Sequence, residues 1–146
     1  MRAVIQRVRS ASVSLQGKEI SRIEAGFLVL LAVKIGDGSE QAGKMAEKII
    51  RLRIFDDADG KMNLSLKDKA GLSVLLVSQF TLYGEADKGN RPSFIKSARP
   101  EEARPLIDLV AGKIAAAGIR AALGSFGEHM EVSLVNDGPA TIILET

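Results

Sequence analysis

Two short polar segments hold the residue types best suited to chemistry. The first is Ser78-Gln79-Phe80-Thr81, which places hydroxyl and amide groups directly after a run of apolar residues. Such groups can orient a substrate where a buried strand leaves the core, although ordinary strand termination gives the same composition. The second is the stretch NDGPAT at 136–141, which by composition alone is typical of a turn between two strands.

The single histidine, His129, is a candidate for a general base. In that arrangement Ser78 or Thr81 would be the nucleophile, and Asp137 would orient the imidazole ring. A lone histidine without a nucleophile-elbow motif such as GxSxG has little specificity. We therefore favour a structural place for His129 at the edge of a strand.

The composition excludes several other kinds of site. The chain has no cysteine and a single histidine, which rules out a disulfide framework, a thiolate nucleophile and metal sites built from several of these residues. We therefore expect neither a metal ion nor an organic cofactor. The turn GDG at 36–38 lacks the third glycine of a dinucleotide-binding loop, because Gln41 occupies that position.

Length and charge favour a single soluble domain. The chain has 146 residues, of which 46% are hydrophobic and 26% charged, so one domain spanning 1–146 has enough apolar material for a core. Its net charge of +2 permits contact with RNA without requiring it. The longest apolar run, 27–33, is far shorter than the roughly 20 residues that cross a bilayer, and the N-terminus does not resemble a secretory signal. We expect a cytoplasmic protein without membrane contact.

Hydrophobic patterning predicts the elements that position these residues. Apolar positions spaced as on one helix face indicate a helix after residue 37, where Asp37 and Glu40 resemble a capping box, and a second helix is expected over 100–117. Strands are expected at 4–15, 19–23, 26–35, 52–55, 61–64, 71–82, 119–123, 129–135 and 141–144. The predicted fold class is α/β, a single compact domain with mixed, largely antiparallel β-sheets and two main helices.

Six segments of the chain resemble one known family. They are MRAVIQRV at the N-terminus, LRIFDDADGKMNLSL at 52–66, VSQFTLY at 77–83, KGNRPSF at 88–94, GSFG at 124–127 and SLVNDGPAT at 133–141. Together and in this order they are far more specific than any one alone, and the chain resembles the D-aminoacyl-tRNA deacylase family along its whole length. One departure is Ala140, where the family usually has valine, and this change removes no polar group.

The resemblance implies a function for the chain. It implies an editing hydrolase that cleaves the ester between a D-amino acid and the terminal adenosine of tRNA, and that also removes glycine mischarged on the tRNA for alanine. L-aminoacyl-tRNA would be rejected. The partners implied are the acceptor ends of D-aminoacyl-tRNA and glycyl-tRNA and a second copy of the chain, with neither DNA nor a membrane.

Chiral selection is implied to lie in a Gly-Pro pair shared between the two subunits. In the implied homodimer, Gly138 and Pro139 are joined by a cis peptide bond and enter the active site of the partner subunit. Their carbonyl oxygens would accept hydrogen bonds from the substrate α-amino group, while an L side chain would be pressed against them. Arg7 would brace the partner's Gly-Pro segment through its guanidinium group, the alternative being a surface arginine. Met130 and Asn136 complete the substrate-binding or supporting residues.

The catalytic segment implied by the resemblance is Ser78-Gln79-Phe80-Thr81. A backbone amide near Phe80 would stabilise the oxyanion, and the 2′-hydroxyl of the terminal adenosine would assist, so that the RNA becomes part of the catalyst. Phe126 would either stack on the terminal adenine or lie in the core. Thr81 is the second choice as a nucleophile, because a neutral hydroxyl needs a base within reach.

The sequence is also compatible with two other functions. One is an RNA-binding module without catalysis, and the other is a serine or threonine esterase that acts on small molecules. Lys88, Arg91 and Lys96, in or beside a long polar loop, would contact tRNA phosphates in either RNA-dependent function. A buried polar pocket favours an enzyme over a simple binding module, and replacing Thr81 or His129 by alanine tests the esterase.

Overall fold

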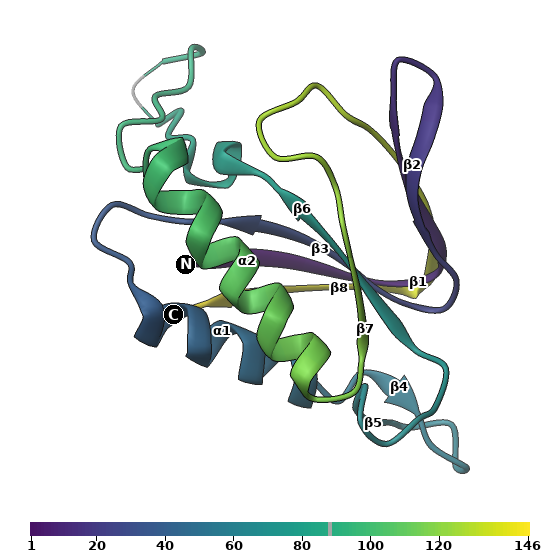
Figure 1. The fold of residues 1–146 in the computed structure, drawn as a ribbon. Helices are drawn as coiled ribbons and strands as arrows, with labels where there is room; N and C mark the ends of the chain where they lie inside the picture. Colours follow the sequence, from purple (N-terminus) through teal and green to yellow (C-terminus); the bar gives the residue numbers. More distant parts are fainter. Residues whose placement is uncertain (88) are drawn as a thin grey trace.

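One long strand organises the sheet. The computed structural model describes residues 1–87 and 89–146. β1 (Arg2–Leu15) pairs antiparallel with β8 (Glu131–Glu145) along one edge. Along its other edge β1 pairs first with β3 (Gly26–Ala32) and then with β2 (Lys18–Ile23), both antiparallel. β1 therefore links most of the antiparallel part of the sheet (Figure 1).

The other edge of β3 begins the parallel part of the sheet. β6 (Ser73–Ser78) lies beside β3, and β7 (Arg120–Leu123) lies beside β6, both in parallel orientation. The order of the sheet is β2-β1-β3-β6-β7, with β8 paired to β1. The predicted mixed α/β fold is confirmed.

Two helices cover one face of this sheet (Figure 1). They are α1 (Ser39–Arg51) and α2 (Pro100–Ala116), which also pack against each other. A small hairpin of β4 (Phe55–Asp56) and β5 (Met62–Leu64) follows α1, as the sequence predicted. The predicted strand at 71–82 is shorter than expected, because the chain leaves β6 after Ser78 and forms a 3₁₀-helix, η1 (Phe80–Tyr83).

An apolar cluster lies on each face of β3. Phe27, Val29 and Leu31 pack into the cluster under the helices. Leu28, on the opposite face, packs into a second cluster inside the curved sheet, together with Leu75 of β6. Because both faces are buried, the sequence of this strand is a continuous apolar run and not an alternating one.

The start of α1 differs from the predicted capping box. The N-cap is Gly38, whose backbone N–H donates to Oε1 of Gln41 at 2.9 Å. Asp37 instead accepts a hydrogen bond from the N–H of Lys34 at 2.6 Å and pairs with the N-terminal ammonium of Met1 at 2.9 Å. The predicted capping box of Asp37 and Glu40 is therefore wrong, because the N-cap is Gly38 and the Asp37 carboxylate binds the turn before the helix.

The C-terminal strand also differs from the prediction. The stretch 136–140 is not a turn between two strands, because β8 runs without a break from Glu131 to Glu145. β1 is long enough to pair with β8 on both sides of this stretch, so the extra residues are absorbed as a bulge. In the described part of the chain, no helix is long and apolar enough to cross a membrane.

Candidate active site

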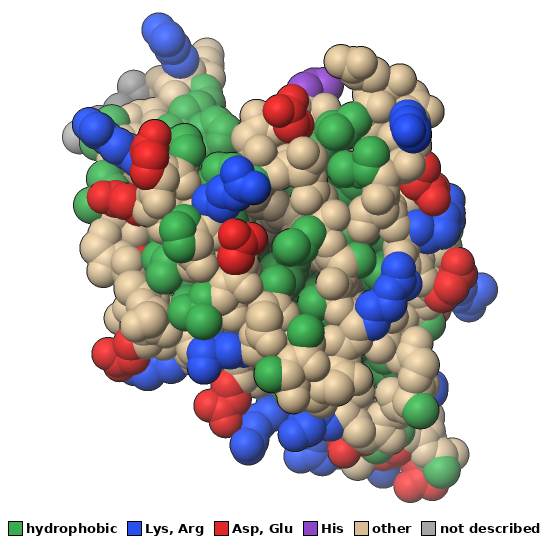
Figure 2. Space-filling view, viewed as in Figure 1, with side chains coloured by type: hydrophobic (Ala, Val, Ile, Leu, Met, Phe, Trp, Pro, Cys, Tyr) green, Lys and Arg blue, Asp and Glu red, His purple; other side chains and the backbone are tan. Residues whose placement is uncertain are grey.

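A pocket of about 600 Å³ lies where β3 and β6 end, next to the first turns of α2. Its walls are mainly apolar, with polar groups from the end of β6 and from the connection between β7 and β8, as is typical of small-molecule sites. Figure 2 shows apolar side chains gathered between α2 and this connection. The lining residues are Leu31, Ala32, Val33, Val77, Ser78, Gln79, Phe80, Ala98, Pro100, Ala103, Ile107, Phe126, Gly127, Glu128, His129, Met130 and Val132.

The pocket brings together five of the predicted site residues. These are Ser78, Gln79, Phe80, Phe126 and Met130. The remaining predicted residues are not among its lining residues: Thr81, Arg7, Asn136, Gly138 and Pro139. Sequence reasoning missed the wall formed by α2, because Pro100, Ala103 and Ile107 have no chemically reactive groups.

The end of β6 positions the polar side of the pocket. The backbone N–H of Gln79 donates to the carbonyl of Leu31 at 2.9 Å, so the strand stays paired with β3 up to this residue. The chain then turns into η1, which leaves the side chain of Phe80 57% exposed at the mouth of the pocket. The side-chain amide of Gln79 donates a hydrogen bond to the Oγ of Thr81. A donor on this oxygen makes Thr81 a poorer nucleophile.

The opposite end of η1 is anchored by the N-terminal strand. The guanidinium group of Arg2 donates to the carbonyl of Leu82 at 2.7 Å and lies 4.9 Å from the centre of the Tyr83 ring. Burial is the main factor that raises the pKa of Tyr83 to about 12, and the negative charge of Asp37 adds to it while Arg2 opposes it. The phenol of Tyr83 therefore stays neutral, and its buried ring fixes the end of η1 by packing.

The connection between β7 and β8 folds closely over Met130. The backbone N–H of Ser125 donates to the sulfur of Met130 at 3.3 Å. A Cβ at Gly124 would lie 2.8 Å from the same sulfur, so a larger residue there would displace Met130 from the pocket wall. Phe126 is half-buried beside it and packs against the main core while it lines the pocket. The contact of Phe126 with the core is thus present in part, and its stacking on the terminal adenine stays a prediction.

His129 lines the pocket but does not assemble a catalytic triad. In the part of the chain that the structure describes, no hydrogen bond joins it to Ser78 or Thr81. Asp137, the expected orienting residue, lies in β8, where its carboxylate pairs with Arg7 and Arg9. His129 is exposed in the connection just before β8, so the predicted place at the edge of a strand is off by two residues, and this geometry fits a histidine that lies near the site better than a positioned general base.

The Gly-Pro pair lies in a bulge of β8, between Asp137 and Ala140. Gln6 pairs with Thr141 and Val8 pairs with Asn136, so Arg7 alone lies opposite the four residues 137–140. The peptide bond between Gly138 and Pro139 is cis, as the family resemblance implied.

Asn136 closes the bulge. Its side-chain carbonyl accepts a hydrogen bond from the N–H of Ala140 at 2.9 Å, and its side-chain amide lies 3.3 Å from the Oγ of Thr141. Gly138 has a φ of +133°, and a Cβ there would lie 3.0 Å from the nitrogen of Ala140 and 3.1 Å from Nη2 of Arg7. Glycine is therefore required at this position.

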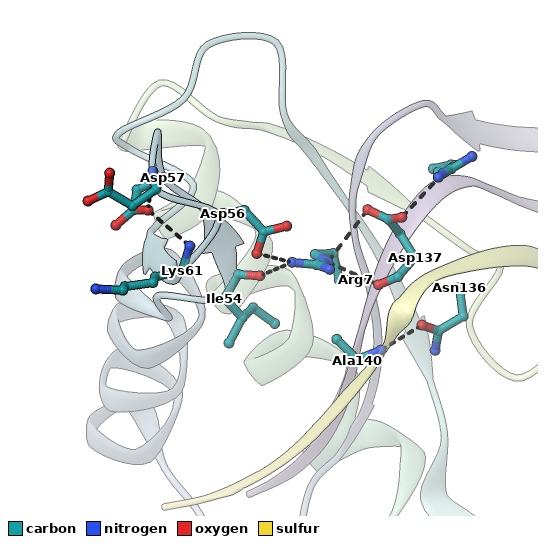
Figure 3. A network of polar contacts seen from close by, with 10 residues as sticks. Arg7, Ile54, Asp56, Asp57, Lys61, Asn136, Asp137 and Ala140 are labelled. Atoms are coloured by element: carbon teal, nitrogen blue, oxygen red, sulfur yellow. Dashed lines mark hydrogen bonds and ion pairs between the residues drawn. The ribbon is translucent and has the colours of Figure 1, made fainter.

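The side chain of Arg7, on β1, supports the bulge. Its side chain is almost fully buried, and its guanidinium group donates to the carbonyls of Asp137 at 3.0 Å and Ile54 at 2.7 Å, and to Oδ1 of Asp56 at 3.2 Å (Figure 3). The sequence-based expectation was that Arg7 would brace the partner's Gly-Pro segment, whereas these contacts lie within its own chain. The N–H donors of a buried guanidinium group need acceptors, and the carbonyls of Asp137 and Ile54 and the carboxylate of Asp56 supply them.

The predicted phosphate contacts are only partly available. Lys96 pairs with Glu85, and Arg91 is exposed on the loop before α2. Lys88 lies outside the described residues. Among residues 1–87 and 89–146, no group of three or more His, Cys, Asp or Glu side chains is placed to hold a metal ion.

Comparison with known proteins identifies the class to which this protein belongs. Relatives named D-aminoacyl-tRNA deacylase from Thermosipho africanus (strain TCF52B) and Geobacter sp. (strain M21) are 52% and 54% identical, and each alignment covers 100% of this chain and 97% of the relative. A solved structure entitled c-Myc DNA Unwinding Element Binding Protein matches with a TM-score of 0.93 and 39% identity, over 100% of this chain and 99% of that one. The chain is accordingly an enzyme of the deacylase class, a hydrolase.

A second comparison identifies the family. The family model described as D-Tyr-tRNA(Tyr) deacylase matches residues 4–145. The chain belongs to this family, and the resemblance seen in its sequence is confirmed.

Proposed function

We propose that the protein hydrolyses the ester bond of D-aminoacyl-tRNA, releases the free D-amino acid and tRNA, and leaves L-aminoacyl-tRNA intact. The observation that carries this proposal is full-length membership in a deacylase family, together with a pocket lined by Ser78, Gln79 and Phe80. A pocket of about 600 Å³ is within the size range of sites that enclose small molecules. The terminal aminoacyl-adenosine of tRNA is a ligand of this kind.

The active site is composite and belongs to a homodimer. Two features support this: Gly138 and Pro139 are exposed, and neither lines the pocket of its own chain. In a two-fold symmetric dimer each subunit can present its bulge to the pocket of the other, which completes two identical sites. Each site then combines the pocket of one subunit with the Gly-Pro pair of its partner.

Selection between D and L substrates rests on the backbone of the bulge. The carbonyl oxygens of Gly138 and Pro139 accept hydrogen bonds from the substrate α-amino group, and the L isomer directs its side chain against them. A ten-thousand-fold preference needs about 5.5 kcal/mol, which requires a rigid selecting group. The buried Arg7 and the hydrogen bond from Ala140 to Asn136 supply this rigidity. Because selection does not depend on contacts with the substrate side chain, tRNAs charged with many D-amino acids or with glycine, including glycyl-tRNA(Ala), are accepted.

The chemical step depends on the backbone and on the RNA. A backbone amide near Phe80 stabilises the negative charge that develops on the ester carbonyl oxygen. The 2′-hydroxyl of the terminal adenosine assists the attack of water. Two observations support a minor role for protein side chains: Thr81 accepts a hydrogen bond from Gln79, and Asp137 lies in the bulge, where it is bound by Arg7 of β1. Met130 supports the pocket wall on which Phe126 offers a surface for the terminal adenine.

The test of this function is the deacylation of matched D-tyrosyl-, L-tyrosyl- and glycyl-tRNA by the purified protein, with and without a chelator. We expect rapid loss of the D and glycyl esters, a stable L ester and no effect of the chelator. Equal rates on D and L esters would indicate a general esterase, and tRNA binding without hydrolysis would indicate an RNA-binding module. Because one structural relative is named for binding DNA, a DNA duplex is added as a competitor, and we expect no inhibition.

A further inference from the structure

We propose that Ser97 is a positioning residue for catalysis, because its side chain fixes the peptide unit between Phe80 and Thr81. The Oγ of Ser97 donates a hydrogen bond to the carbonyl of Phe80 at 2.9 Å. The inference rests on the proposed function, in which a backbone amide near Phe80 stabilises the oxyanion. Ser97 does not line the pocket, so its role is indirect.

Ser97 has a fixed position although it follows a long loop. On either side of it, the N–H of Ile35 donates to the carbonyl of Lys96, and the N–H of Ala98 donates to the carbonyl of Val33, both at 3.0 Å. Ser97 itself forms an isolated antiparallel bridge with Lys34. The segment 96–98 thus pairs with the chain that continues beyond β3, just after β6 has turned away into η1. The hydroxyl group is therefore held at the point where the catalytic segment leaves the sheet.

The side chain of Phe80 is held by the same loop. The ring of Phe94 meets the ring of Phe80 edge-on, with 5.2 Å between the ring centres and 71° between the planes. Gly84 makes room for this contact, because a Cβ there would lie 2.8 Å from Cε1 of Phe94. Phe80 is 57% exposed, so core packing alone does not fix its orientation. The loop therefore holds Phe80 at two points, its ring and its carbonyl.

The hydrogen bond from Ser97 controls the direction of a neighbouring donor. A peptide unit is planar, so fixing the carbonyl of Phe80 also fixes the N–H of Thr81, which points the opposite way in a trans unit. If the plane of this peptide unit rotates, the backbone N–H of Thr81 no longer points in the direction needed to donate to the ester carbonyl oxygen. Loss of one oxyanion donor typically lowers kcat by about 100- to 1,000-fold, and misalignment has a smaller effect. For removal of the Ser97 hydroxyl we expect a fall of about 10- to 100-fold in kcat.

The test compares three variants at this position on D-tyrosyl-tRNA. Ser97→Ala should lower kcat by about 10- to 100-fold. It should change KM by less than about threefold, because the pocket walls and the bulge are untouched. Ser97→Thr keeps a hydroxyl group and should restore most of the activity. Ser97→Cys keeps a similar volume with a weaker donor, and its kcat should lie between those of the alanine and threonine variants. The proposal can therefore be tested even if the alanine variant does not fold.

The matched control is Ser93→Ala in the same loop. The contacts of Ser93 with Glu85 are between backbone atoms, so kcat should not change in this variant.

The outcomes separate this proposal from the function on which it rests. No hydrolysis of D-tyrosyl-tRNA by the wild-type protein would overturn both. Wild-type hydrolysis with an unchanged kcat in Ser97→Ala would overturn the role of Ser97 alone. A loss that appears in KM, or that threonine does not restore, would equally contradict it. A lower kcat with an unchanged KM, restored by threonine, would support it.

Discussion

The bulge of β8 and the pocket at the end of β6 are stabilised in different ways. The bulge is held by polar contacts, because the buried Arg7 binds two carbonyls and a carboxylate, and Asn136 closes the loop. The pocket has mainly apolar walls, and its exposed Phe80 depends on contacts with a distant loop. This difference matches the two tasks that we propose for these regions: the bulge would distinguish mirror images and must be rigid, whereas the pocket would accept the end of an RNA.

Filling the pocket should have the largest effect on activity. Ala103 lines the pocket from α2, so in Ala103→Phe the phenyl ring would occupy the space needed by the substrate. We expect kcat/KM for D-tyrosyl-tRNA to fall by about 1,000-fold or more. The matched control is Ala116→Phe at the exposed end of the same helix, which should retain wild-type kinetics. Normal activity in Ala103→Phe would place the reaction elsewhere.

Disturbing the bulge should have the second-largest effect on activity. Gly138→Ala introduces a Cβ against Arg7 and Ala140 at a positive φ, and we expect kcat/KM to fall by about 100-fold, with weaker discrimination between D- and L-tyrosyl-tRNA. Gly17→Ala is the control, because Gly17 also has a positive φ but lies in a turn with open space around it. Both variants should lose stability because of the positive φ, by about 1 kcal/mol in Gly17→Ala and by more in Gly138→Ala, where the Cβ also meets neighbouring atoms, and only Gly138→Ala should lose activity. Equal kinetics in the two variants would count against the bulge as the selecting group.

Changing the support of the bulge should mainly affect stability. Arg7→Lys keeps the charge but loses the planar set of donors that reach Asp137 and Ile54, and we expect about 2 kcal/mol of destabilisation in urea unfolding. Arg9→Lys is the control, since the side chain of Arg9 is 77% exposed and its pair with Asp137 should contribute less than about 1 kcal/mol. A similar change in both variants would show that burial of Arg7 adds nothing.

The smallest effects are expected for two side chains near or in the pocket. Thr81→Ala and His129→Ala should each change kcat by less than about threefold, because neither residue belongs to an assembled nucleophile and base pair. Steady-state kinetics on D-tyrosyl-tRNA, together with the pH dependence of kcat, provide the measurement. A fall of about 100-fold in either variant would restore the esterase mechanism with a side-chain nucleophile or base.

The sequence predicts those parts of the structure that depend on local patterning. The continuous apolar run of β3 indicated burial on both faces, and the spacing of Ala42, Met45 and Ile49 indicated the buried face of α1. The bulge could not be predicted in the same way, because NDGP has the composition of a turn. Its place inside a strand depends on β1, which offers pairing partners on both sides of Arg7.

The pocket was predictable only through its polar residues. Ser78 and Gln79 stand out because they place polar groups directly after a buried apolar run, and both line the pocket. The wall formed by Ala103 and Ile107 has no such signal, since these residues equally suit a helix core. The hydrogen bond from Ser97 to Phe80 joins a strand end to a distant loop, and only the fold brings the two together.

The central claim is that each active site combines the pocket of one subunit with the bulge of the other. Co-expression of Ala103→Phe and Gly138→Ala chains with different affinity tags tests it directly, because each variant alone should be nearly inactive. Random pairing makes half of the dimers mixed, and one of the two sites in each mixed dimer is intact, so about a quarter of wild-type activity should return. The control is the double variant co-expressed with wild-type chains, measured on mixed dimers isolated through both tags, because this removes the wild-type dimers and leaves dimers that contain no intact site. Failure of the two single variants to restore activity, with mixed dimers present, would contradict the composite site.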